Sequence, residues 1–139
     1  MALFPVFDTV NSALTTNRIW MNAISDNLAN VNTIRPYDQP AFQARFVEAQ
    51  ELPSQAGVPV GVGGGVTVKS IQYGDSVGLQ RYEPGNPLAN KDGYVRSPNI
   101  DVGQNMTDLI IAQRAYQLNL AVISRASDSY RQAIQINGK

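Results

Sequence analysis

Apolar residues recur at every fourth and then third position along the last third of the chain, from Val102 to Asn137. This spacing places them in one stripe along one side of an α-helix. Asp101 precedes the run and Gln104 follows three residues later, which is a capping-box pattern for a helix start. The sequence therefore predicts a long helix from residue 102 onward. Its stripe would form a helix seam that includes Leu109, Tyr116, Leu120 and Ile123.

The same stretch also carries apolar residues on the opposite side, where a helix that lies on one small domain should be polar. These residues include Ile111, Leu118 and Val122. One interpretation is a central helix in a small bundle. The other is a helix that lies between copies of itself, or of relatives, in a polymer. The polymer interpretation makes these three side chains candidates for burial between subunits.

The first third of the chain mirrors the last. The 4-3 spacing returns over residues 4–32 and predicts a second helix, whose seam residues are Leu14, Met21, Ile24 and Leu28. Asn17 interrupts the stripe, either to fix the register of the packing or because it lies near a wet end of it. The outer face carries short uncharged residues that suit close contact with another surface. Ile19 and Trp20 flank the stripe and are further candidates for subunit contacts.

The middle of the chain, residues 34–100, holds most of the glycines and prolines and is therefore not helical. Alternating apolar and polar residues predict short strands over 42–46, 66–73 and 77–81. The glycine-rich stretch 57–65 lacks the Gly-Lys-Ser/Thr ending of a phosphate-binding loop, so we interpret it as a flexible loop.

The predicted fold is mainly α with a small β insertion. Long N- and C-terminal helices pack as a coiled-coil-like pair, with a short β-rich segment between them. The expected boundaries are 1–33 for the first helix, 34–100 for the middle segment and 101–139 for the second helix.

Composition narrows the possible functions. The 139 residues contain eleven basic and eleven acidic side chains, so the basic surface of a nucleic-acid-binding protein is missing. Without cysteine or histidine, disulfides, thiol chemistry, the usual zinc sites and imidazole-based catalysis are all excluded. An enzyme would have to use carboxylates together with Lys69 or Lys91, so we expect no catalytic role, no cofactor and no small-molecule substrate.

The amino-terminal residues lack the pattern of a cleaved signal peptide. The protein therefore either stays inside the cell or leaves by a route that uses none.

Two segments carry a resemblance to a known family. The end of the first predicted helix, residues 25–33, would by itself indicate a helix C-terminus that runs into a turn. It also resembles the amino-terminal signature of the axial proteins of the bacterial flagellum, in the residues Asn27, Ala29, Asn30, Asn32 and Thr33.

The second segment lies before the closing helix. It includes Gly93, Tyr94, Val95, Arg96, Pro98 and Asn99 and, together with residues 112–117, resembles the proximal rod proteins of the flagellar basal body.

The resemblance implies a structural subunit of the rod, the hollow drive shaft of the motility apparatus, which crosses the periplasm. It implies a helical array with other rod proteins and copies of itself, and contact with basal-body ring and export components. It also implies type III export without a cleaved signal peptide. The alternative that the residues leave open is a soluble coiled-coil adaptor that stops at a dimer and has no flagellar role.

Overall fold

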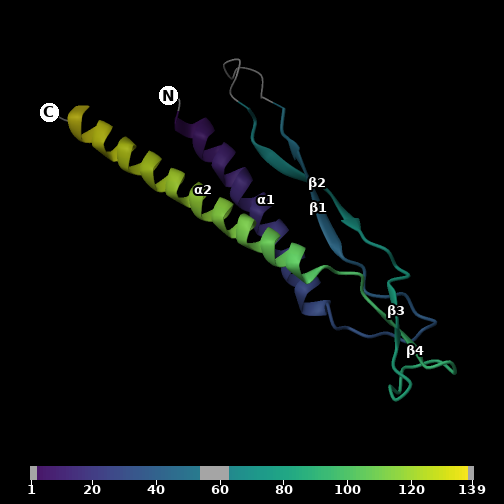
Figure 1. The fold of residues 1–139 in the computed structure, drawn as a ribbon. Helices are drawn as coiled ribbons and strands as arrows, with labels where there is room; N and C mark the ends of the chain where they lie inside the picture. The colour runs from purple at the N-terminus through teal and green to yellow at the C-terminus, as the bar shows by residue number, and fades with distance from the viewer. Residues whose placement is uncertain (1–2, 54–62, 138–139) are drawn as a thin grey trace.

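The computed structural model describes residues 3–53 and 63–137, which form two long helices and four strands (Figure 1). In chain order these are α1 (Leu3–Asn30), β1 (Arg45–Glu51), β2 (Val66–Tyr73), β3 (Leu79–Tyr82), β4 (Tyr94–Ser97) and α2 (Val102–Asn137). The fold class predicted from the sequence, mainly α with a small β insertion, is confirmed.

The layers are α2, then α1, then the β1–β2 sheet (Figure 1). Helix α1 packs against α2 on one side and against β1 and β2 on the other, whereas α1 is the only one of the described helices and strands that α2 contacts. Small and branched side chains are buried in the interior, among them Val10, Ala23, Ile24 and Ala112. Within one chain, therefore, the helix with neighbours on two sides is α1.

The strands form two antiparallel pairs. In the first pair, Arg45 of β1 lies opposite Tyr73 of β2, and the register shifts between Glu48 and Ala49. The second pair is formed by β3 and β4. Strand β2 matches its predicted span, but β1 begins three residues later than predicted, and β4 was not predicted.

The β1–β2 hairpin sits directly on α1. The backbone amide of Val66 donates to Ser12 Oγ at 3.0 Å. The preceding Gly65 has φ +101°, and a Cβ there would lie 2.3 Å from the same oxygen. Ser12, one of the short side chains of α1, thus contacts the chain's own hairpin. Of the glycine-rich stretch, residues 57–62 lie outside the described residues, but Gly65 is tightly packed.

Helix α2 starts at the predicted place, although its cap differs in one respect. Asp101 Oδ1 accepts the backbone amide of Gln104 at 2.9 Å, as the capping pattern predicts. The side-chain amide of Gln104, however, donates to Asp108 at 3.0 Å, one turn further along the helix. At the other end, α2 reaches past the first residues of α1, and Tyr130, Ile134 and Ile136 are exposed there (Figure 1).

Candidate assembly site

The face of α2 that meets α1 has small residues at its centre. Asn105 and Ala112 are buried, and between and beyond them Leu109, Tyr116 and Ile123 are partly buried. The predicted seam residue Leu120 lies at the edge of this face and is 45% exposed. On α1, Ile24 is buried, while Leu14, Met21 and Leu28 are partly buried. The helices are therefore close at Ala112, a position that the apolar stripe alone does not indicate.

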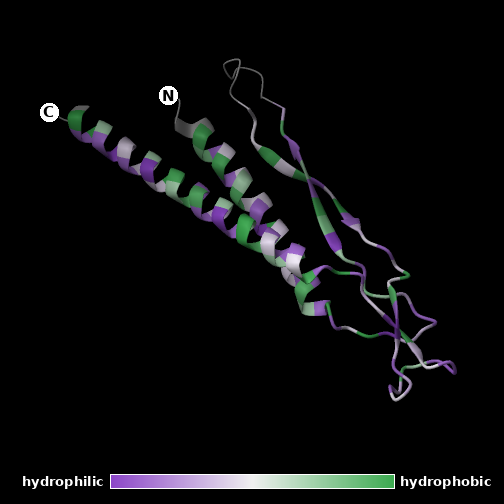
Figure 2. Ribbon diagram, viewed as in Figure 1, coloured by the Kyte–Doolittle hydropathy of each residue, from purple (hydrophilic) through white to green (hydrophobic). Residues whose placement is uncertain are grey.

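Large apolar side chains remain exposed on both flanks of α2, and hydrophobic and hydrophilic residues alternate along the helix (Figure 2). One flank carries the three predicted contact residues Ile111, Leu118 and Val122, and Leu118 is 68% exposed. The other flank carries Val102, Met106, Ile110 and Leu120, at helical spacing. Exposed apolar side chains grouped in this way are typical of surfaces that contact another molecule.

The other two candidates, Ile19 and Trp20, lie elsewhere. Both are partly buried and line grooves between α1 and the β1–β2 hairpin. Trp20 lines a groove of about 320 Å³ with Val47 and Val66. Ile19 lines a groove of about 500 Å³ with Leu52 and Val68. The five candidate contact residues therefore fall into two separate places, the flank of α2 and the hairpin side of α1.

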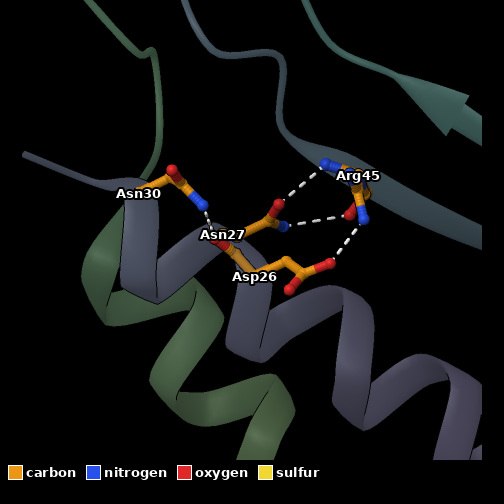
Figure 3. Close-up of polar contacts among 4 residues, drawn as sticks. All are labelled: Asp26, Asn27, Asn30 and Arg45. Atoms are coloured by element: carbon orange, nitrogen blue, oxygen red, sulfur yellow. Dashed lines mark hydrogen bonds and ion pairs between the residues drawn. The ribbon is translucent and has the colours of Figure 1, made fainter. Parts of the chain in front are cut away.

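Asn27, in the first signature segment, joins three elements. Its side chain is 1% exposed and pairs with the backbone of Arg45 as a neighbouring strand would (Figure 3). Oδ1 accepts the Arg45 amide at 2.8 Å, and Nδ2 donates to the Arg45 carbonyl at 2.9 Å. Nδ2 also donates to Asn105 Oδ1 in α2 at 3.1 Å. An ion pair between Asp26 and the Arg45 guanidinium reinforces the contact.

The rest of that segment ends the helix. Asn30 donates from Nδ2 to the Asp26 carbonyl at 2.9 Å, and Thr33 donates from its hydroxyl to Asn30 Oδ1 at 3.1 Å. Ala29 and Asn32 are exposed. Left-handed backbone is not used here, because every described residue with positive φ is a glycine. The helix-end interpretation thus describes Asn30 and Thr33 well, but Asn27 holds tertiary contacts instead.

In the second signature segment, Arg96 binds the loop that follows α1. Arg96 donates from Nε to the Tyr37 carbonyl and from a terminal nitrogen to the Val77 carbonyl, each at 2.7 Å. Its guanidinium lies 4.7 Å from the centre of the Tyr37 ring, a cation–π contact. Arg96 of β4 thereby holds together the segment after α1 and the segment that precedes β3.

The residues next to Arg96 in the sequence pack around these contacts. Val95 has no exposed surface, and Pro98 is buried as well. Gly93 has φ +81°, and a Cβ there would lie 2.8 Å from the Tyr82 ring. That ring makes an edge contact with Tyr94, at 5.3 Å between centres. Asn99 is exposed.

Among the ionisable groups of the described residues, one has a markedly shifted pKa. Hydrogen bonds from Lys69, Ser70 and Gln72 lower the pKa of Glu48 on β1 to about 2. Across residues 3–53 and 63–137, no group of three or more acidic side chains lies close enough to hold a metal ion. Over the same ranges, neither helix is long and apolar enough to cross a membrane.

This arrangement defines a structural protein class: an antiparallel pair of terminal helices, with uncovered apolar flanks, tied to a small β segment. The comparisons with known proteins agree. The family model described as flagella basal body rod protein matches residues 7–36. The model described as flagellar basal body rod FlgEFG protein C-terminal matches residues 91–136. Both signature segments lie inside the matched ranges.

Curated relatives extend the match over nearly the whole chain. The flagellar basal-body rod protein FlgC of Salmonella typhimurium is 36% identical over 126 residues, covering 89% of this chain and 90% of the relative. FlgC of Borreliella burgdorferi is 34% identical over 149 residues, covering 98% of each. FlgC of Bacillus subtilis is 31% identical over 148 residues, covering 98% and 99%.

The chain therefore belongs to the flagellar basal-body rod proteins of the FlgC type. It is a structural subunit of the flagellar basal-body rod, and the family resemblance seen in the sequence is confirmed.

Proposed function

We propose that the two uncovered flanks of α2 are the surfaces through which this rod subunit contacts its neighbours in a helical array. One observation carries the proposal: α2 packs on α1 alone among the described elements, yet it has large apolar side chains on both flanks. Fully burying one such side chain contributes about 1.5–3 kcal/mol.

Two different flanks favour an extended polymer. When one flank of a subunit meets a different surface of the next, the contact does not close on itself, and copies add into a helical filament. A dimeric adaptor would need only one self-complementary surface. In this arrangement residues 1–33 and 101–139 form the axial core domain, and residues 34–100 form the middle segment.

The same proposal includes partners and location. The neighbours are copies of this chain and other rod proteins, with basal-body ring and export components at the base. The chain reaches its place in the rod, across the periplasm, through the flagellar type III apparatus and without a cleaved signal peptide. Its role in motility is mechanical, with no catalytic function. Membership in a family of rod proteins supports these inferences.

The test is Leu118→Asp, because Leu118 is 68% exposed and a charge there does little to the free chain. We expect unchanged helix content by circular dichroism, together with loss of rod assembly and of motility. Gln132→Asp is the matched control, since it introduces the same charge at an exposed polar position of α2 and should preserve motility. A Leu118→Asp subunit that assembles normally would remove this flank from the interface.

Sedimentation of the unmodified chain at rising concentration tests the polymer itself. We expect species that grow beyond two chains. A plateau at a dimer would favour the adaptor.

A further inference from the structure

Every hydrogen-bonding group of the Asn27 amide is used. Its oxygen accepts from the Arg45 amide, and its two N–H groups serve the Arg45 carbonyl and Asn105 Oδ1. The side chain is buried, so bulk water does not replace a partner that is lost. A buried polar group without a partner is unfavourable, which makes this amide sensitive to all three contacts at once.

Asn105 is held in one orientation as well. Its Nδ2 donates to the Asp101 carbonyl at 2.8 Å, so its oxygen must face Asn27. The result is a continuous series of hydrogen bonds from the cap of α2, through two side-chain amides, to the first residue of β1. Residues 78 positions apart in the chain meet in its central bond.

The pair also selects one register of α2 on α1. The 4-3 apolar pattern repeats, so sliding α2 by one heptad would keep apolar residues in the seam. That slide would bring Ala112 or Pro98 opposite Asn27, and neither side chain can accept its N–H. A polar pair at one seam position is the best-attested device for fixing register.

We propose that Asn27 and Asn105 act as a positioning pair that couples two docking events. When α2 lies in register, Asn105 holds the Asn27 amide in the orientation that binds the Arg45 backbone, and the β1–β2 hairpin is then seated on α1. Without that partner, Asn27 loses its fixed orientation, and the start of β1 loosens. This inference rests on the fold alone and is independent of how subunits assemble.

The test replaces Asn105 by leucine, which fills the space and leaves both Asn27–Arg45 bonds chemically possible. Backbone amide exchange is measured by NMR on the full chain. We expect the Arg45 amide of Asn105→Leu to exchange roughly tenfold faster than in the unmodified chain. The Arg96 amide, which pairs with Arg35 in the other β segment, should be unchanged.

Asn119→Leu is the matched control. It makes the same chemical change two heptads further along the same face of α2, away from β1, and should leave Arg45 exchange unaltered. Equal Arg45 exchange in Asn105→Leu and the unmodified chain would overturn the proposal, as would equal acceleration in both variants.

A titration of the unmodified chain with urea gives a second readout that does not depend on a variant. The Arg45 amide and the amides of the first turns of α2 should lose protection at the same urea concentration. Loss of protection at Arg45 while the first turns of α2 stay protected, or the reverse, would show that the hairpin packs on α1 independently.

Discussion

The two helices have similar seam patterns in the sequence but different surroundings in the structure. Helix α1 lies between α2 and the β1–β2 hairpin, so other parts of the same chain cover α1 on two sides. Helix α2 is longer, with 36 residues against 28, and is covered by α1 alone among the described elements. Its flanks carry Ile111, Leu118 and Leu120 in exposed positions.

This difference shows that an apolar stripe does not by itself say what will cover it. In α1 the apolar and small residues complete the interior of one subunit. In α2 most of the large apolar side chains are exposed, with no covering partner within the described chain. Substitutions in α1 should therefore act on folding, while substitutions on the flanks of α2 should act on assembly.

The largest contrast is between two aspartate substitutions. Ile24→Asp places a charge where the side chain is 3% exposed, between α1 and α2, and should destabilise the subunit by roughly 4 kcal/mol or more. Leu120→Asp, at a position 45% exposed, should keep most of the helix content and yet block rod assembly and motility.

Circular dichroism melts and motility assays on both variants measure these effects. Equal unfolding of the two variants would mean that Leu120 belongs to the interior after all. Normal assembly of Leu120→Asp would mean that this flank of α2 stays in water.

A smaller effect is expected where the two helices are close. Ala112 has no exposed surface, so Ala112→Leu should force the helices apart and cost about 1–3 kcal/mol. Ala121→Leu, on the exposed side of the same helix, should change the unfolding free energy little. Urea unfolding followed by circular dichroism compares the two. Equal stability of Ala112→Leu and Ala121→Leu would refute close helix packing at Ala112.

The hairpin side of α1 is tested by Gly65→Ala. The left-handed φ of Gly65 and its contact with Ser12 should make alanine cost about 1–3 kcal/mol in the seating of the hairpin. Gly85→Ala is the control, because a Cβ there would meet nothing within 4 Å. Amide exchange at Val66, which donates to Ser12, reports the loss. Unchanged protection of the Val66 amide would argue against tight packing of the hairpin on α1 at Ser12.

The smallest effect is a pH dependence on the exposed face of the hairpin. The pKa of Glu48 is lowered from 4.5 to about 2 in the folded chain. Its hydrogen bonds therefore favour the folded state fully above pH 4.5, and this contribution is lost as the pH falls toward 2. Because Glu48 is exposed, solvent screens the effect. An NMR titration of the Glu48 carboxylate measures the pKa, and a midpoint near 4.5 would contradict the contacts with Lys69, Ser70 and Gln72.

Local patterns predicted most of the fold. Helix α2 spans 102–137, as the spacing predicts, and α1 ends within two residues of its predicted end, because long amphipathic stripes are strong signals. Strand β4 was not predicted, since the alternation within Tyr94–Ser97 is too short to stand out. The start of β1 depends on pairing with Tyr73 and with the Asn27 side chain, and a local pattern contains neither.

The packing face of α2 was harder to predict than its existence. Periodicity selects large apolar residues, so it selected Leu120 and passed over Asn105 and Ala112, which form the centre of the contact. Small residues are buried because they let backbones approach, and hydropathy does not capture this property. The sequence does contain one indication of the role of Asn105. A buried asparagine in a helix seam needs a hydrogen-bond partner, and Asn27 in the other helix has an amide side chain that can pair with it.

The path of the backbone has a consequence for a shaft that carries load. Helix α2 is joined to β4 by only residues 98–101, so covalent bonds run from one end of the molecule to the other through a single continuous segment (Figure 1). Under tension along the long axis, α2 can lengthen only by breaking its own backbone hydrogen bonds, so these bonds resist the load. Twisting is different, because it shears α2 against α1, and resistance to it depends on the fit at Ala112 and on the amide pair beside it. Axial strength and torsional stiffness of the subunit thus have separate origins and can be altered separately.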